Sequence, residues 1–155
     1  MQRRIFLALG PWLALPQAHA HHGRSSFDQT RPLYLEGRVV KAAWRNPHAE
    51  LELEASPQLK LPADLATRTP PAQTAPVDGA GLLKAAQLPK RRDRRWELEL
   101  APLTRMQAWQ VPEIKAGDDV AVLGFAAAGE QGEAVMRVEY LFFRGKTYGL
   151  RSAPA

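Results

Sequence analysis

Five stretches of the chain have the hydrophobic patterns of β-strands. The alternation is strictest in Glu50–Glu54, where Leu51 and Leu53 lie between glutamates. Asp119–Phe125 is more continuously apolar, which is typical of a strand buried on both faces. The stretches that we predict as strands are Leu33–Val40, Glu50–Glu54, Arg95–Leu100, Asp119–Phe125 and Glu133–Phe143.

One helix is predicted between the third and the fourth of these strands. Leu103, Met106 and Trp109 recur every three residues within Pro102–Ile114, which places them on one face of a short helix. Five short strands with a helix in this place have the proportions of an OB-like barrel. We therefore predict a mainly β protein, a small five-stranded OB-like β-barrel with one short helix, and an open β-sandwich is the alternative.

A long segment, Ser56–Arg94, interrupts this pattern. Its 39 residues hold six of the 13 prolines and many alanines, and only Leu82–Leu88 indicates one or two helical turns. Loops of this length without structure of their own are either functional or disordered. We expect this Pro/Ala-rich insertion, residues 56–94, to be flexible within a single domain that spans residues 21–155.

Residues 1–20 have the organisation of a secretory signal peptide. Arg3 and Arg4 precede a short apolar stretch, Ile5–Leu15, and an Ala-x-Ala cleavage site ends at Ala20. The apolar stretch is too short to cross a bilayer, which needs about 20 residues. We predict cleavage after Ala20, export to the periplasm, and no transmembrane segment in the remaining chain.

The first residues also bear on the export route. Arg3–Leu7 (RRIFL) resembles the twin-arginine signal, which has two arginines, any residue, Phe and Leu. The signal is short for that class, and basic pairs also begin ordinary signals. We therefore favour Sec export over the twin-arginine route.

Composition narrows the possible chemistry. The 155 residues include no cysteine, which excludes disulfides, thiolate nucleophiles and cysteine-based zinc or iron–sulfur sites. The net charge of +5 includes Arg3 and Arg4, so the mature chain carries two positive charges fewer. Such a mild excess does not call for a polyanion, and we expect no nucleic-acid partner.

The histidines that remain after cleavage lie in two short motifs and suggest a metal site. His21 and His22 begin the mature chain, where the α-amine and imidazoles supply nitrogen ligands near neutral pH. His48 follows an Asn-Pro pair at the start of a predicted strand. If the N-terminus folds back across the barrel, the three histidines share one metal ion, with a carboxylate from Asp28 or Glu50. Nitrogen-rich sets favour Cu(II), so copper is the first candidate and zinc the second.

The same histidines also have an ordinary interpretation. Terminal residues that follow a cleavage site are often mobile and without a role of their own. His48 could equally hydrogen-bond its neighbours in a turn that opens a strand. Both interpretations stay open at this point.

No catalytic signature is present in the sequence. The chain lacks a nucleophile-elbow serine, a zinc-protease histidine pair, a P-loop and a dinucleotide-binding glycine motif. The glutamates of Glu50–Glu54 and Glu97–Glu99 occupy alternating positions, which are typical of the solvent-facing side of a strand. We therefore predict a non-enzymatic protein.

A second functional hypothesis is a metal-free OB-like interaction module that binds a periplasmic protein or an anionic ligand. It would use the insertion and the basic run that ends it. The candidate binding residues of this run are Lys90, Arg91, Arg92, Arg94 and Arg95. The alternative for the run is a solvated group of charges that flanks a strand.

Several motifs together resemble one family of small exported bacterial proteins. Its members carry two histidines after a signal peptide, then a Phe, a Leu-Glu-Gly strand, a Trp-x-Asn-Pro-His-Ala segment and a later strand with a Trp. The matching residues here are His21-His22-Gly23, Phe27, Leu35-Glu36-Gly37, Trp44–Ala49, Trp96–Glu99 and the turn at Gly117-Asp118. On these residues the chain resembles DUF6152, an uncharacterised family.

The resemblance implies a small periplasmic β-barrel in which the histidines matter together. It implies no established activity. The chain departs from the family at Ser56–Arg94, where a short hairpin connection is usual, and at Glu50, where an aromatic residue is common.

Overall fold

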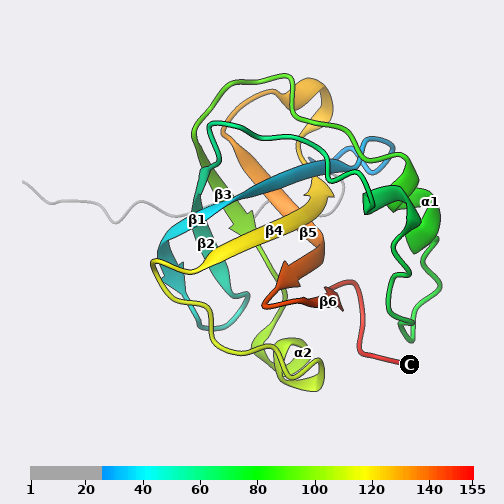
Figure 1. The fold of residues 1–155 in the computed structure, drawn as a ribbon. Coiled ribbons are helices and arrows are strands. Elements are labelled where there is room, and N and C mark those ends of the chain that lie inside the picture. The colour runs from blue at the N-terminus through cyan, green and yellow to red at the C-terminus, as the bar shows by residue number, and fades with distance from the viewer. Residues whose placement is uncertain (1–25) are drawn as a thin grey trace, which may run out of the picture.

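The computed structural model of the protein describes residues 26–155 (Figure 1). Within these residues, six strands and two short α-helices carry the fold. The strands are β1 (Leu33–Ala43), β2 (Glu50–Ala55), β3 (Arg95–Glu99), β4 (Asp119–Phe125), β5 (Val135–Phe143) and β6 (Lys146–Gly149). The helices are α1 (Gly79–Lys84) and α2 (Leu103–Ala108).

Five of the strands close into a barrel. β1 pairs antiparallel with β2 and with β4, β2 pairs with β3, and β4 pairs with β5. The parallel pairing of β3 with β5, with Leu98 opposite Met136, completes the ring. α2 lies between β3 and β4 in the chain and at the lower end of the barrel in Figure 1. The prediction of a small five-stranded OB-like β-barrel is therefore confirmed.

β6 is a sixth strand that the sequence pattern did not predict. It pairs with β5 on the side away from β4, with Tyr140 opposite Gly149. The two strands are joined by Arg144 and Gly145, both with positive φ, at 50° and 75°. Such a tight hairpin turn usually has Asn or Asp in the place of Arg144. The sequence therefore contains no clear hairpin signal between β5 and β6.

The alternating leucines of β2 face the barrel core, as predicted. Leu51 and Leu53 are 1% and 0% exposed, and they pack in one cluster with Trp96 and Leu98 of β3. Leu53 lies opposite Trp96 in the β2–β3 ladder, and Leu51 lies opposite Leu98. The glutamates between them are only partly buried, on the other face.

The insertion forms a layer on the outside of the barrel, teal to green in Figure 1. Its Leu65 and Leu83 are buried in a second hydrophobic cluster with Tyr34, Leu123 and Tyr140 of the barrel strands. The structure shows the segment packed against β1, β4 and β5. The predicted flexibility of the segment stays a prediction. The two buried leucines lie too far apart in the sequence to produce a periodic pattern.

Local contacts determine where α1 lies in this layer. Asp78 accepts a hydrogen bond from the Gly81 amide (2.9 Å), which caps the helix at its N-terminus. The helix thus begins at Gly79, before the stretch Leu82–Leu88 that we predicted as helical turns, and it ends at Lys84. Because Asp78 caps the helix, α1 begins earlier in the chain than the predicted helical turns.

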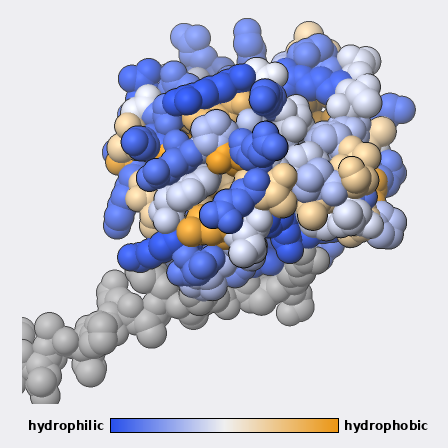
Figure 2. Space-filling view, turned by 90° about the horizontal axis from the view of Figure 1, so that it is seen from below, coloured by the Kyte–Doolittle hydropathy of each residue, from blue (hydrophilic) through white to orange (hydrophobic). Residues whose placement is uncertain are grey.

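Large hydrophobic side chains are rare on the surface of residues 26–155. Leu61, which is 40% exposed, is the one exposed large hydrophobic residue in this range. The face in Figure 2 is mostly hydrophilic, and its hydrophobic residues lie in small separate patches. None of the helices formed by these residues has the length and apolar character needed to cross a membrane.

Candidate functional site

A polar cavity of about 170 Å³ lies beside the seam where β3 and β5 pair. Segments from seven parts of the chain form its wall: the residues before β1, the residues before β2, the β3–α2 connection, α2, the end of β4, β5 and the residues after β6. Its polar lining residues are Gln29, His48, Arg105, Arg137, Glu139 and Arg151. The convergence of several polar groups makes this cavity a candidate binding site.

A β-bulge brings Glu139 into this wall. In the β4–β5 ladder Leu123 lies opposite Tyr140 and Gly124 lies opposite Val138, so Glu139 is an extra residue without a partner in β4. A Cβ atom at Gly124 would overlap the carbonyl oxygen of Arg137, which explains why the strands can approach so closely only at a glycine. The bulge thus adds one residue to β5 at the point where β5 lines the cavity.

Glu139 is a buried carboxylate with one satisfied oxygen. The residue is 6% exposed, and its Oε2 accepts hydrogen bonds from Nε (3.1 Å) and Nη2 (2.8 Å) of Arg151. Its Oε1 is buried and has no hydrogen-bond partner among the residues that the structure describes. Leaving a buried acceptor unsatisfied costs about 1–3 kcal/mol, and more for a charged group. A buried acceptor of this kind calls for an explanation, and a molecule bound in the cavity would supply one.

A second buried ion pair stabilises the seam. Glu99 and Arg137 lie opposite each other in the β3–β5 ladder, and Glu99 Oε2 accepts a hydrogen bond from Arg137 Nη2 (3.1 Å). The guanidinium of Arg137 also lies over the ring of Phe27, 5.6 Å from the ring centroid. This contact holds the start of the described chain against the cavity.

The third arginine of the wall comes from α2. Arg105 Nη1 donates to the carbonyl oxygen of Leu150 (2.8 Å). Trp109, directly after the helix, donates its ring N–H to the carbonyl oxygen of Ser152 (2.8 Å). These two bonds hold the segment after β6 against α2, so that Arg151 meets Glu139.

His48, the one histidine among the described residues and a predicted metal ligand, is half-buried and lines this cavity. Its neighbours are held by the start of α2 and the connection before it: the Asn46 side-chain oxygen accepts the Leu103 amide (3.3 Å), and the Ala49 amide donates to the Ala101 carbonyl (3.0 Å). Phe27 lines the same cavity. The structure therefore brings the residue five positions after His22 to the same place as His48.

The other predicted ligands are not gathered there. His21 and His22 lie outside the described residues. Asp28 is absent from the cavity wall, and its Oδ1 accepts hydrogen bonds from the hydroxyl (2.5 Å) and the amide (3.0 Å) of Thr30, which lower the pKa of Asp28. Residues 26–155 contain no group of three or more His, Cys, Asp or Glu side chains placed to hold a metal ion.

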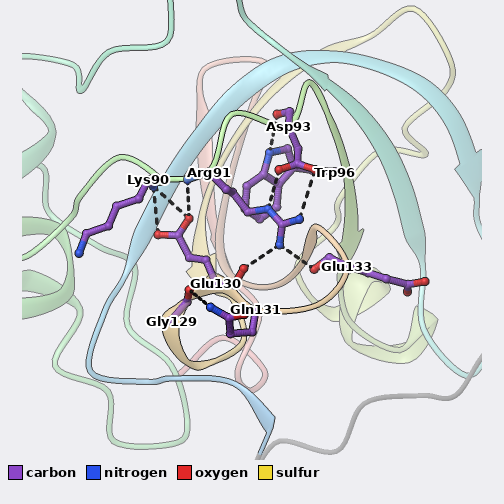
Figure 3. A network of polar contacts seen from close by, with 8 residues as sticks. All are labelled: Lys90, Arg91, Asp93, Trp96, Gly129, Glu130, Gln131 and Glu133. Carbon is purple, nitrogen blue, oxygen red and sulfur yellow. Dashed lines mark hydrogen bonds and ion pairs between the residues drawn. The ribbon is translucent and has the colours of Figure 1, made fainter.

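Most of the basic run is joined to the protein's own carboxylates and carbonyls, and Figure 3 shows the contacts of Lys90 and Arg91. Arg91 forms an ion pair with Asp93 (2.7 Å), donates to the carbonyl oxygen of Glu130 (2.9 Å), and lies over the ring of Trp96. The remaining ion pairs of the run are Arg94 with Glu54, and Arg95 with Glu52 and Glu54. Lys90 and Arg92 are exposed and form no ion pair with the described residues. The run therefore attaches the end of the insertion to the barrel.

Glu130 is the anchor of this attachment. Its carboxylate accepts the backbone amides of Lys90 (2.9 Å) and Arg91 (3.0 Å) and pairs with Arg31 (3.1 Å). Burial alone would raise the pKa of Glu130, but the hydrogen bonds from the two amides and from Arg31 outweigh it and lower the pKa. Glu130 thus stays ionised in the folded protein.

Sequence reasoning missed the residues that give the cavity its charge, namely Arg105, Arg137, Glu139 and Arg151. The one available signal was in β5, where Arg137 and Glu139 interrupt an otherwise apolar strand. Charged residues in such a strand are buried only when they are paired.

The comparisons with known proteins agree with the motif resemblance. A family model described as "Family of unknown function (DUF6152)" matches residues 13–60, which confirms the resemblance to that family over this part of the chain. No curated protein and no solved structure matches the chain significantly.

Proposed function

We propose that the protein is an exported, non-enzymatic metal binder of the periplasm, which holds a copper ion with His21, His22 and His48; zinc is the second candidate. The observation that carries the proposal is that Phe27 and His48 line one cavity. Five residues of extended chain span about 17 Å, so His22 is within reach of His48.

The proposed ligands suit copper chemically. The α-amine and the ring Nδ1 of His21 form a chelate, and His22 and His48 add imidazole nitrogens. Nitrogen ligands favour Cu(II) among the first-row divalent ions. The amine and imidazoles must lose their protons to bind, so the affinity rises with pH up to about pH 8.

The charges of the cavity limit where the metal ion binds. Arg105, Arg137 and Arg151 repel a cation from the interior. The proposed site is therefore on the His48 side of the cavity. Asp28 is less suited to the site than the histidines, because Thr30 already occupies its Oδ1.

A metal-free interaction module is the second candidate. The exposed Lys90 and Arg92 leave the basic run some capacity for an anionic ligand or a periplasmic protein. Arg91, Arg94 and Arg95 are already paired with carboxylates of the chain, and such pairs weaken this candidate. Charge reversal of Lys90 and Arg92 tests it, because partner capture then has to fail.

The test of the metal site is a Cu(II) competition titration against a chromophoric chelator. The protein is processed to begin at His21, and His48→Ala is compared with Gln29→Ala, which alters the same cavity without removing a ligand. We expect at least a tenfold loss of Cu(II) affinity for His48→Ala and none for Gln29→Ala. Unchanged affinity in a folded His48→Ala variant would rule out the shared site.

A further inference from the structure

The interior of the cavity carries an excess of positive charge. Three arginines line it, Arg105, Arg137 and Arg151, against one lining carboxylate, Glu139. Glu99, which is not among the lining residues, pairs with Arg137. The interior therefore attracts an anionic group more readily than a metal cation.

Donor capacity is left over on two of these arginines. Arg137 and Arg151 each use Nε and Nη2 on a single carboxylate oxygen. Neither Nη1 has an acceptor among the residues that the structure describes. Guanidinium N–H groups in this state are the preferred partners of a ligand carboxylate.

Acceptor capacity is left over on Glu139. Its buried Oε1 has no donor among the described residues. A ligand with only negative charge would place like charges together there, whereas an ammonium or hydroxyl group would donate to Oε1. The cavity is thus complementary to one molecule that has both a carboxylate and a hydrogen-bond donor.

The size of the cavity limits that molecule. A volume of about 170 Å³ is far more than one water occupies, which is about 30 Å³. It is well below the roughly 300–1,000 Å³ of pockets for drug-sized ligands. The occupant is therefore a molecule of only a few heavy atoms.

We propose that this cavity binds a small carboxylic acid with a donor on its α-carbon, that is, an α-amino or α-hydroxy acid. The arginines take the carboxylate, and Glu139 Oε1 takes the ammonium or hydroxyl group. The β-bulge that inserts Glu139 into the wall is the feature that creates this second half of the site. The site needs neither His21 nor His22, so it does not depend on the proposed metal function.

Isothermal titration of the metal-free mature protein in EDTA tests the inference. Two probes, glycine and glycolate, present both a carboxylate and a hydrogen-bond donor on the α-carbon. Acetate presents the carboxylate alone, and methylamine presents the amine alone. We expect glycine or glycolate to bind at least tenfold more tightly than acetate, and methylamine not to bind. Glycine against glycolate distinguishes the amino acid from the hydroxy acid.

The variant Glu139→Gln tests whether Glu139 is responsible for the preference for a ligand with a donor on its α-carbon. It should remove the preference for glycine or glycolate over acetate, whereas Glu130→Gln, in a buried glutamate–arginine pair outside the cavity, should retain it. If Glu139→Gln fails to fold, the four-probe series on the unaltered protein still decides. The inference is overturned if neither glycine nor glycolate binds, if acetate binds equally well, or if a folded Glu139→Gln variant keeps the preference.

Discussion

Arg151 binds Glu139 through one carboxylate oxygen only: Oε2 accepts both hydrogen bonds, and Oε1 receives none from the described residues. The pair therefore compensates the charge of a buried carboxylate without satisfying it. This one-sided pairing connects the fold to the candidate site, because the same two side chains join the segment after β6 to β5 and line the cavity.

Removing Arg151 should destabilise the protein more than removing the pair. Arg151→Met leaves the Glu139 charge buried and unpaired, which we expect to cost about 2–3 kcal/mol, below the range for a fully buried pair because Arg151 is partly exposed. Adding Glu139→Gln to Arg151→Met should restore part of that loss. Urea denaturation of both single variants and the double variant measures the coupling. Strictly additive effects would show that the two side chains do not interact.

Acid should weaken the contact between Glu130 and the end of the insertion. The pKa of Glu130 is lowered in the folded protein, so its stabilising effect is complete above its ordinary pKa of about 4.3 and is lost as the pH falls through the folded value. We expect Glu130→Gln to cost about 1–3 kcal/mol at pH 7 and less at pH 3.

Urea unfolding at the two pH values measures that difference. Glu133→Gln is the matched control, since it removes a charge from an exposed side chain of the same loop. A gap between Glu130→Gln and the unaltered protein that is equal at pH 7 and pH 3 would contradict the assignment.

The insertion should contribute to stability through its buried leucines. Leu83→Ala removes a side chain that is 1% exposed and should cost about 2–4 kcal/mol. Leu61→Ala alters an exposed leucine of the same insertion and should change the free energy of unfolding by less than about 0.5 kcal/mol. Thermal or urea denaturation compares the two. Equal small effects would mean that the insertion does not pack stably on the barrel.

The predicted signal peptide should be removed after Ala20. N-terminal sequencing of the exported protein should begin at His21, because Ala20 ends the small-residue cleavage site. Replacing Arg3 and Arg4 by lysine keeps the positive charge and should leave Sec export intact. Loss of export on that conservative change would instead assign the twin-arginine route.

The strands of the barrel were predictable because the alternation of hydrophobic and polar residues can be read within each short stretch of sequence. Alternate residues of β2, such as Leu51 and Leu53, face one core, and this alternation is visible in five consecutive residues. The layer formed by the insertion was not predictable in the same way. Leu83 packs against Tyr34 and Tyr140, which lie far away in the sequence.

The candidate site was only partly predictable for a related reason. His48 was singled out by its motif, and the structure places it in a cavity wall. The role of Glu139 depends on a bulge opposite Gly124 and on contact with Arg151 after β6. Register between strands and the path of the last residues are properties of the assembled barrel, which the local pattern of β5 does not contain.

The most direct test of the proposed metal function is a Cu(II) titration of two proteins that differ by one residue. One begins at His21, and the other carries a single additional glycine before His21. The extension keeps every side chain but moves the α-amine away from the His21 ring. We predict that the extension lowers the Cu(II) affinity at least tenfold. Equal affinity in the two proteins would contradict an amine-anchored site.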